Sequence, residues 1–262
     1  MGVIVGGDLM SITLVILACI AGFIGAMVDA IVGGGGLVTT PALLALGLPT
    51  HIALGTNKFA STMGAMSSTY HYFKSGNMNG RLLKYVLPFS LIGSAFGVLT
   101  VLGIDPEFLK KVIIGLVLLI GTYTIARKDL GMENKFLGLT KKNIFLGMCL
   151  ALTLGFYDGF FGPGTGSFLI FGLISIYGFD FVKASANTRV LNLTSNITAL
   201  ILFLLNGKVY FLIAVPMGIC MMIGAKVGSQ MAIEKGSKFI KPVFVVMSLL
   251  LVIKMTLDIM AA

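Results

Sequence analysis

The chain contains one long pattern twice. It reads GAMVDAIVGGGGLVTTPALLALGLPTHIALGTNKFASTMGA over residues 25–65 and GFYDGFFGPGTGSFLIFGLISIYGFDFVKASANTRVLNLTSN over residues 155–196. Each copy has an aspartate in apolar surroundings, a glycine-rich break, a short apolar run, and then a polar cluster with one cation. The aspartates Asp29 and Asp158 lie 129 residues apart, and the cations Lys58 and Arg189 lie 131 residues apart. A repeat of this length indicates a duplicated half-protein rather than a small solenoid unit.

The composition is that of a membrane protein. The 262 residues are 57% hydrophobic and 11% charged, with a mean hydropathy of +1.01, whereas soluble domains carry about a quarter charged residues. Charge-free stretches such as 30–57 and 159–179 reach the length of about 20 residues that crosses a bilayer. We therefore expect an all-α polytopic membrane protein in the cell membrane. Its net charge of +9 indicates basic cytoplasmic loops and not a nucleic-acid partner.

The apolar pattern predicts about ten helical segments, five in each copy. Two of them, 36–48 and 165–178, are too short to cross comfortably and follow glycine-rich breaks, so we expect half-helices or re-entrant pieces. The chain then divides into a first membrane repeat (1–127), a cytoplasmic linker (128–141) and a second membrane repeat (142–262). The expected segments are 9–31, 36–48, 52–74, 82–103, 107–126, 142–161, 165–178, 181–205, 209–232 and 238–260.

Loop charge predicts the orientation. On this segment count, 12 Lys and Arg residues of the loops fall on one side and 3 on the other, so the first side is expected to be cytoplasmic and both termini to lie outside. Because five segments per copy is an odd number, the second copy should enter the membrane inverted. Inverted repeats with interrupted helices are typical of secondary transporters, whose substrates bind near the midplane.

The two glycine-rich breaks are the first candidate site. A half-helix that begins at such a break points unpaired N–H groups inward, and its dipole favours an anion there. The alternative, close helix packing through small residues, is our interpretation of Gly93, Gly97, Gly224 and Gly228. The candidate residues of the breaks are Gly33, Gly34, Gly35 and Gly36 in the first copy, and Gly162, Gly164, Thr165 and Gly166 in the second.

The two cations are the second candidate. Lys58 and Arg189 fall inside apolar segments, where a charge is costly unless it is paired or wetted, and two cations beside a midplane cavity would bind an oxyanion. The alternative is that both extend to the membrane interface. Polar side chains accompany them: Thr56 and Asn57 before Lys58, Asn187 and Thr188 before Arg189, and Asn192 and Asn196 after Arg189 on one helical face, where the first copy has Ser61 and Ala65.

Asp29 and Asp158 precede the breaks by four residues. Intramembrane carboxylates are functional candidates, and two roles compete: counter-ion to Lys58 or Arg189, or proton carrier. The coupling ion could be H⁺ or Na⁺. Histidines and cysteines show no ligand spacing, so no metal or cofactor is expected. A homodimer is compatible with the sequence.

The pattern resembles the sulfite exporter TauE/SafE family of membrane transporters. The resemblance rests on the Asp followed by the GxGG break, on Pro41, on the segments ALGTNK and ASANTR, and on the inverted duplication. It covers nearly the whole chain and implies a permease, usually an exporter, for small sulfur-containing anions such as sulfite, sulfoacetate or related organosulfonates. Pro163-Gly164-Thr165 departs from the four glycines of the first copy, so the two half-sites are unequal.

Two other functions are compatible with the sequence. A passive anion channel could carry the same inverted repeats. An intramembrane aspartyl protease would use Asp29 and Asp158 as a dyad that shares one proton, but the GxGD partner motif of such proteases is missing. The cations at repeat-matched positions would also favour two ionised carboxylates. We therefore expect a transporter and not an enzyme.

Overall fold

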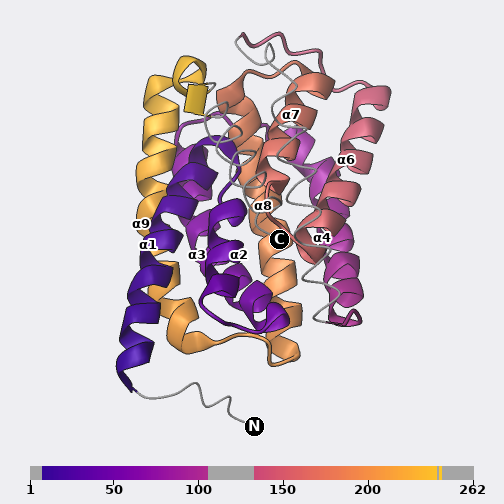
Figure 1. Cartoon of the computed structure of the whole chain (residues 1–262). Coiled ribbons are helices and arrows are strands. Elements are labelled where there is room, and N and C mark those ends of the chain that lie inside the picture. The colour runs from indigo at the N-terminus through magenta and orange to yellow at the C-terminus, as the bar shows by residue number, and fades with distance from the viewer. Residues whose placement is uncertain (1–7, 106–132, 241, 244–262) are drawn as a thin grey trace, which may run out of the picture.

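The protein is a bundle of helices (Figure 1). The computed structural model describes residues 8–105, 133–240 and 242–243, in which no strand occurs. Its helices are α1 (Asp8–Val32), α2 (Gly36–Ala45), α3 (Thr50–Lys74), α4 (Gly80–Leu102), α6 (Lys141–Phe160), α7 (Thr165–Tyr177), α8 (Phe181–Leu205) and α9 (Phe211–Lys235).

These helices match the predicted segments to within a few residues. Five of them, α1, α4, α6, α8 and α9, are long and apolar enough to cross a membrane, which makes the chain a multi-pass membrane protein. The predicted segment 107–126, most of 238–260 and the linker before residue 133 lie outside the described residues.

The two short helices turn back on the helices that precede them. In Figure 1, α2 runs in the opposite direction to α1, and α7 runs in the opposite direction to α6. The chain reverses at glycines with positive φ, Gly33 at 81° and Gly162 at 94°, a conformation that a Cβ atom makes costly. Both short helices are therefore half-helices that begin inside the bundle.

Glycines hold two pairs of helices in backbone contact. A Cβ atom at Gly93 or Gly97 of α4 would overlap the backbone of α6 at Leu152 or Phe156. The repeat-matched glycines of α9, Gly224 and Gly228, meet the backbone of α1 at Phe23 and Met27 in the same way. The prediction that these glycines serve helix packing is confirmed. Each of the two seams, α4–α6 and α1–α9, joins the first half of the sequence to the second.

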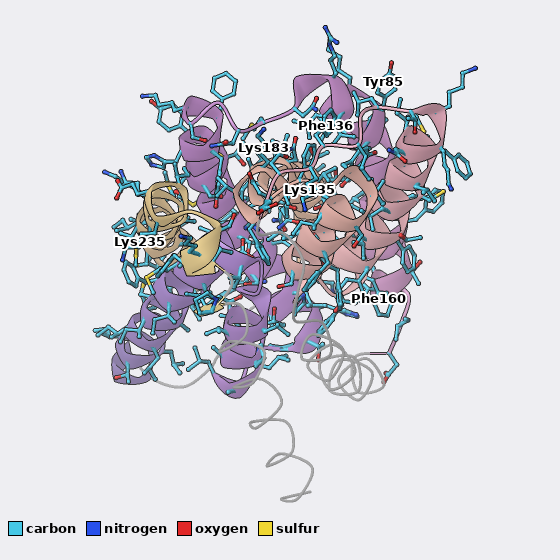
Figure 2. The ribbon with its side chains drawn as sticks, turned by 90° about the horizontal axis from the view of Figure 1, so that it is seen from above. Tyr85, Lys135, Phe136, Phe160, Lys183 and Lys235 are labelled. Carbon is cyan, nitrogen blue, oxygen red and sulfur yellow. The ribbon has the colours of Figure 1, made fainter. Side chains whose placement is uncertain are left out.

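Basic residues gather at one end of the bundle. The C-terminal ends of α3 and α9 and the N-terminal ends of α4, α6 and α8 all lie at the upper end in Figure 1. Figure 2 looks down on this end, with Lys135, Lys183 and Lys235 labelled. These helix ends also carry Lys74, Arg81, Lys84, Lys141 and Lys142. The basic residues counted on one side in the sequence thus lie at one end of the bundle.

We predict that Gly93→Ala destabilises the protein. Its methyl group would overlap the Leu152 carbonyl oxygen, and overpacking of this kind costs about 1–3 kcal/mol. Thermal unfolding of the purified protein in detergent should show a clear fall in Tm. Gly80→Ala is the control, because a Cβ atom there meets nothing within 4 Å; equal Tm values for the two variants would contradict the backbone seam.

Candidate functional site

Two ion pairs inside the bundle cross between the two sequence copies. The Nη1 of Arg189 on α8 lies 2.5 Å from the Oδ2 of Asp29 on α1, and the Nζ of Lys58 on α3 lies 2.9 Å from the Oδ2 of Asp158 on α6. Lys58 is 3% exposed and Arg189 is 1% exposed. The alternative that these cations extend to the membrane interface is therefore wrong. Each carboxylate is a counter-ion to the cation of the other copy.

Neighbouring groups hold the two pairs in different ways. Asp158 accepts a hydrogen bond from the Ser195 hydroxyl at 2.6 Å, and Lys58 donates to Asn196 Oδ1 at 3.0 Å. Asp29 instead accepts from the backbone N–H of Gly35 at 3.3 Å. Side chains of α8 therefore support the Lys58–Asp158 pair, while the break before α2 supports Asp29.

The two glycine-rich breaks touch each other. The Ser167 N–H donates to the Gly33 carbonyl oxygen at 3.1 Å, and the Ser167 hydroxyl donates to the Val32 carbonyl oxygen at 2.8 Å. A Cβ atom at Gly36 would meet the backbone of Pro163. The N-terminal ends of α2 and α7 therefore meet inside the bundle, as close as their backbones allow.

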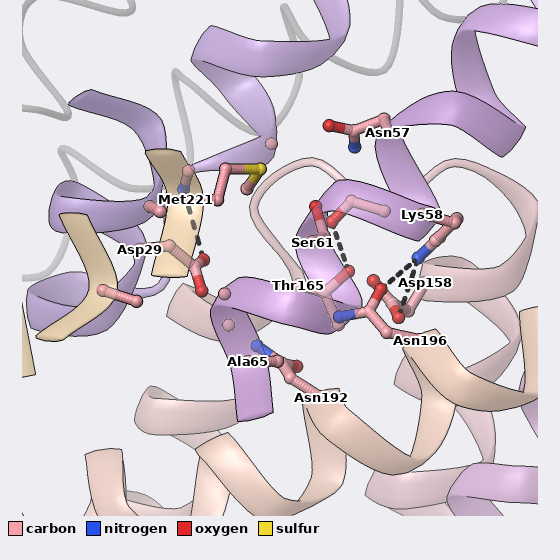
Figure 3. Close-up of a pocket in the computed structure, with 17 residues that line it drawn as sticks. Asp29, Asn57, Lys58, Ser61, Ala65, Asp158, Thr165, Asn192, Asn196 and Met221 are labelled. Atoms are coloured by element: carbon pink, nitrogen blue, oxygen red, sulfur yellow. Dashed lines mark hydrogen bonds and ion pairs between the residues drawn. The ribbon is translucent and has the colours of Figure 1, made fainter. Parts of the chain in front are cut away.

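A cavity lies where these ends meet α3 (Figure 3). About 520 Å³ of empty space, open solvent included, lies between its lining residues. Most of the predicted site residues line it: Asp29, Gly35, Gly36, Asn57, Lys58, Asp158, Gly162, Thr165, Gly166 and Asn192. Ser61, Ala65 and Asn196, which share helical faces with the cations, also line it.

Other predicted residues lie outside the cavity lining. Arg189 is behind Asp29, and Gly33, Gly34 and Gly164 form the backbone of the breaks. The Thr56 hydroxyl accepts from the Tyr210 N–H at 3.0 Å, and Asn187 Oδ1 accepts from the Asn79 N–H at 2.9 Å, so both residues tie helices to loops. Thr188 is fully buried and its hydroxyl has no partner among the described residues.

The sequence did not reveal part of the cavity wall. Ala26 and Gly64 line it, as do Met221 and Ala225 of α9. These side chains are small or apolar and carry no chemical signal. They become wall residues because α1 and α3 both pack against α9.

The cavity combines several groups that bind anions. The first N–H groups of a helix have no intrahelical partner, and the first turns of α2 and α7 reach the cavity at Gly36 and Gly166. Lys58 contributes the positive side chain, and Asn57, Thr165 and Asn192 contribute polar ones. No group of three or more potential metal ligands occurs within residues 8–105 and 133–240.

Comparison with known proteins identifies the family of the chain. The family model of the sulfite exporter TauE/SafE matches residues 18–255. The chain belongs to the TauE/SafE family. It is 39% identical over 245 residues to a "probable membrane transporter protein" of Haemophilus influenzae, covering 94% of this chain and 95% of the relative.

Other relatives of this TauE/SafE chain have the same kind of description. It is 36% identical over 246 residues to the probable membrane transporter YfcA of Escherichia coli K12, covering 92% of this chain and 88% of YfcA. It is 24% identical to the probable membrane transporter YdhB of Bacillus subtilis over 223 residues, or 85% of this chain and 89% of YdhB. No solved structure matches the chain.

We predict strong coupling between Lys58 and Asp158. Lys58→Met and Asp158→Ala each leave an unpaired buried charge, which costs about 3–5 kcal/mol. The double variant removes both charges. Its loss of stability, measured by thermal unfolding in detergent, should be much smaller than the sum of the losses in the two single variants.

A surface pair is the control for this cycle. Lys135 and Glu133 are 3.3 Å apart, with side chains 78% and 76% exposed, so Lys135→Met should leave Tm nearly unchanged. If the stability losses of Lys58→Met and Asp158→Ala add up in the double variant, the two side chains do not interact.

Proposed function

We propose that this protein is a secondary transporter that exports small sulfur-containing anions, such as sulfite or organosulfonates like sulfoacetate. The observation that carries the proposal is the cavity where the first turns of two half-helices meet a buried lysine. The family description supplies the substrate class. Half-helix N-termini that face a central site are a recurrent means of binding anionic groups in transporters.

The anion would sit between the two breaks. Gly36 and Gly166, in the first turns of α2 and α7, line the cavity together with Lys58. The Thr165 hydroxyl and the amides of Asn57 and Asn192 would complete the hydrogen bonds to a tetrahedral head group. Arg189 would act through Asp29, since its guanidinium lies behind that carboxylate.

The proposal includes an inverted relation between the two copies. Reciprocal contacts support it: Asp29 pairs with Arg189 while Asp158 pairs with Lys58. The same exchange occurs in the seams, where α1 packs on α9 and α4 packs on α6. Thr56 and Asn187, which are repeat-matched, receive the N–H groups of Tyr210 and Asn79, which are also repeat-matched. Such reciprocity is what a pseudo-two-fold axis in the membrane plane would produce.

Orientation and mechanism follow from this arrangement. The end of the bundle that carries the lysines would face the cytoplasm of the cell, because basic residues favour that side, and both termini would then lie outside. Rocking of one part of the bundle against the other would expose the cavity to each side in turn. The proposed units are the repeats 1–127 and 142–262.

The alternative functions have less support. A protease dyad needs two carboxylates that share a proton, whereas Asp29 and Asp158 each have a cation of their own. A passive anion channel remains the alternative, and it would conduct far faster than a carrier turns over. The carrier is favoured because the two breaks close against each other at Gly33 and Ser167.

We predict that Lys58 is required for anion binding. Calorimetric titration of the purified protein with sulfite, sulfoacetate, ethanesulfonate, sulfate and acetate should show binding of a sulfur-containing anion. Lys58→Gln should weaken that binding at least about tenfold, because a hydrogen bond to a charged group contributes about 1.5–3 kcal/mol. Lys226→Gln is the control, since Lys226 is exposed and outside the cavity; unchanged affinity in Lys58→Gln would remove Lys58 from the site.

We predict that the two ends of the bundle are labelled from opposite sides of the cell membrane. In a variant without native cysteines, Asn206→Cys should react with an impermeant thiol reagent added to intact cells. Arg81→Cys should react only after the cells are opened, because the basic end faces the cytoplasm. Both positions are exposed. The reverse pattern would overturn the proposed orientation.

A further inference from the structure

The cavity is electrically balanced before any anion enters. Among the described residues, its charged lining groups are Lys58, Asp29 and Asp158, and the charge of Arg189 lies directly behind Asp29. Two carboxylates therefore offset two cations. A bound monoanion would leave one negative charge uncompensated in a buried site, which is costly unless a cation enters with it.

The anion and Asp158 compete for the same cation. Lys58 is the cation that lines the cavity, and its ammonium already contacts Asp158 at 2.9 Å and Asn196 at 3.0 Å. Asp158 is nearly buried, with a side chain 7% exposed. An anion that draws the ammonium away would leave this carboxylate without its counter-ion. A proton that binds to Asp158 removes the unpaired negative charge of this carboxylate.

The hydrogen bonds around Asp158 accommodate both of its protonation states. The Ser195 hydroxyl is 2.6 Å from Asp158 Oδ2 and 3.1 Å from the Asn192 carbonyl oxygen. It can donate to the carboxylate when Asp158 is ionised. When Asp158 carries a proton, the acid can donate to the Ser195 oxygen, and Ser195 can donate to the Asn192 carbonyl oxygen. Every donor then still has an acceptor.

Asp29 lacks this property. Its hydrogen-bond partners among the described residues are the Arg189 guanidinium and the Gly35 N–H, and both are donors. A proton on Asp29 would face a cation and an N–H group with no acceptor among these partners. Asp29 also keeps both partners when an anion binds at Lys58. The two repeat-matched aspartates therefore differ in whether a neighbouring side chain can accept their proton.

We propose that Asp158, with Ser195 as its hydrogen-bond relay, is the proton-coupling site of the transporter. Resting on the proposed anion site, this inference assigns H⁺ as the coupling ion and a stoichiometry of one proton per monoanion. The groups that face Asp158 are Lys58 from α3 and Ser195 and Asn196 from α8, while Asp29 on α1 and Thr165 on α7 line the same cavity. The neighbouring Tyr157 hydroxyl donates to the Pro163 carbonyl oxygen at 2.7 Å. Transport of the pair is electroneutral, so the membrane potential does not drive it, and export would follow the outward concentration gradient of the anion.

Calorimetry in buffers of different ionisation enthalpy tests the inference on the unmodified protein. Ethanesulfonate is the probe, because it stays a monoanion at all working pH values and so takes up no proton itself. About one proton should be taken up per ethanesulfonate bound, and the affinity should fall about tenfold per pH unit over the range in which that proton is taken up, as linkage of one proton requires. Binding without proton uptake, or with a requirement for Na⁺ instead, would overturn the coupling site. Absence of any binding would overturn the anion site itself, and this inference with it.

Three variants locate the proton. Asp158→Asn should bind ethanesulfonate with proton uptake near zero and an affinity independent of pH. In Asp29→Asn, the ethanesulfonate binding that is retained should still be accompanied by uptake of about one proton. Thr153→Ala, on the same helix as Asp158 with its hydroxyl bonded to its own helix backbone at 2.8 Å, should match the unmodified protein. Full proton uptake in Asp158→Asn would overturn the assignment to this residue.

Discussion

Four charges lie inside an apolar bundle, three of them buried, and they constrain everything else in this structure. Moving a charge out of water costs several kcal/mol even after relaxation, so a buried charge persists only with a close partner. Here each partner comes from the other sequence copy: Asp29 holds Arg189, and Asp158 holds Lys58. The charged side chains, which cost the most free energy to bury, therefore join the two copies. Neither copy alone contains the counter-ions of its own charges.

Small residues bring these charges together with the breaks. Glycines let α1 approach α9 and α4 approach α6 at backbone distance, and they allow the reversals that start α2 and α7 inside the bundle. The first turns of two half-helices therefore open onto the same space as Lys58. One arrangement of the backbone therefore produces the cavity, the helix N–H groups that face it and the ion pair beside it.

Much of this arrangement could be predicted from the sequence because the pattern occurs twice. A lone aspartate, a glycine-rich break and a cation recur at matched positions, which singled out Asp29, Asp158, Lys58 and Arg189 and indicated that they belong to one site. The lengths of the apolar runs predicted the helices, including the two that are too short to cross.

Which partner each group takes could not be read from the pattern. Either aspartate was a plausible counter-ion for either cation, and only the fold, which brings Arg189 to Asp29 and Lys58 to Asp158, decides the pairs. Repeat matching also predicted equal roles for Lys58 and Arg189, but Lys58 lines the cavity and Arg189 stands behind Asp29. Thr56 and Asn187 resembled ligands, yet they bind backbone N–H groups of loops that are distant in sequence.

The seam between α1 and α9 has a consequence for how the protein is made. α1 ends at Val32 and α9 begins at Phe211, so the ribosome must synthesise most of the chain before the surface that fits α1 exists. During that interval α1 sits in the lipid with the backbone carbonyl groups of Phe23 and Met27 not yet covered by Gly224 and Gly228. Assembly is therefore a late event in biogenesis, and a chain that stops after its first half exposes an unfinished surface to the quality-control proteases of the membrane.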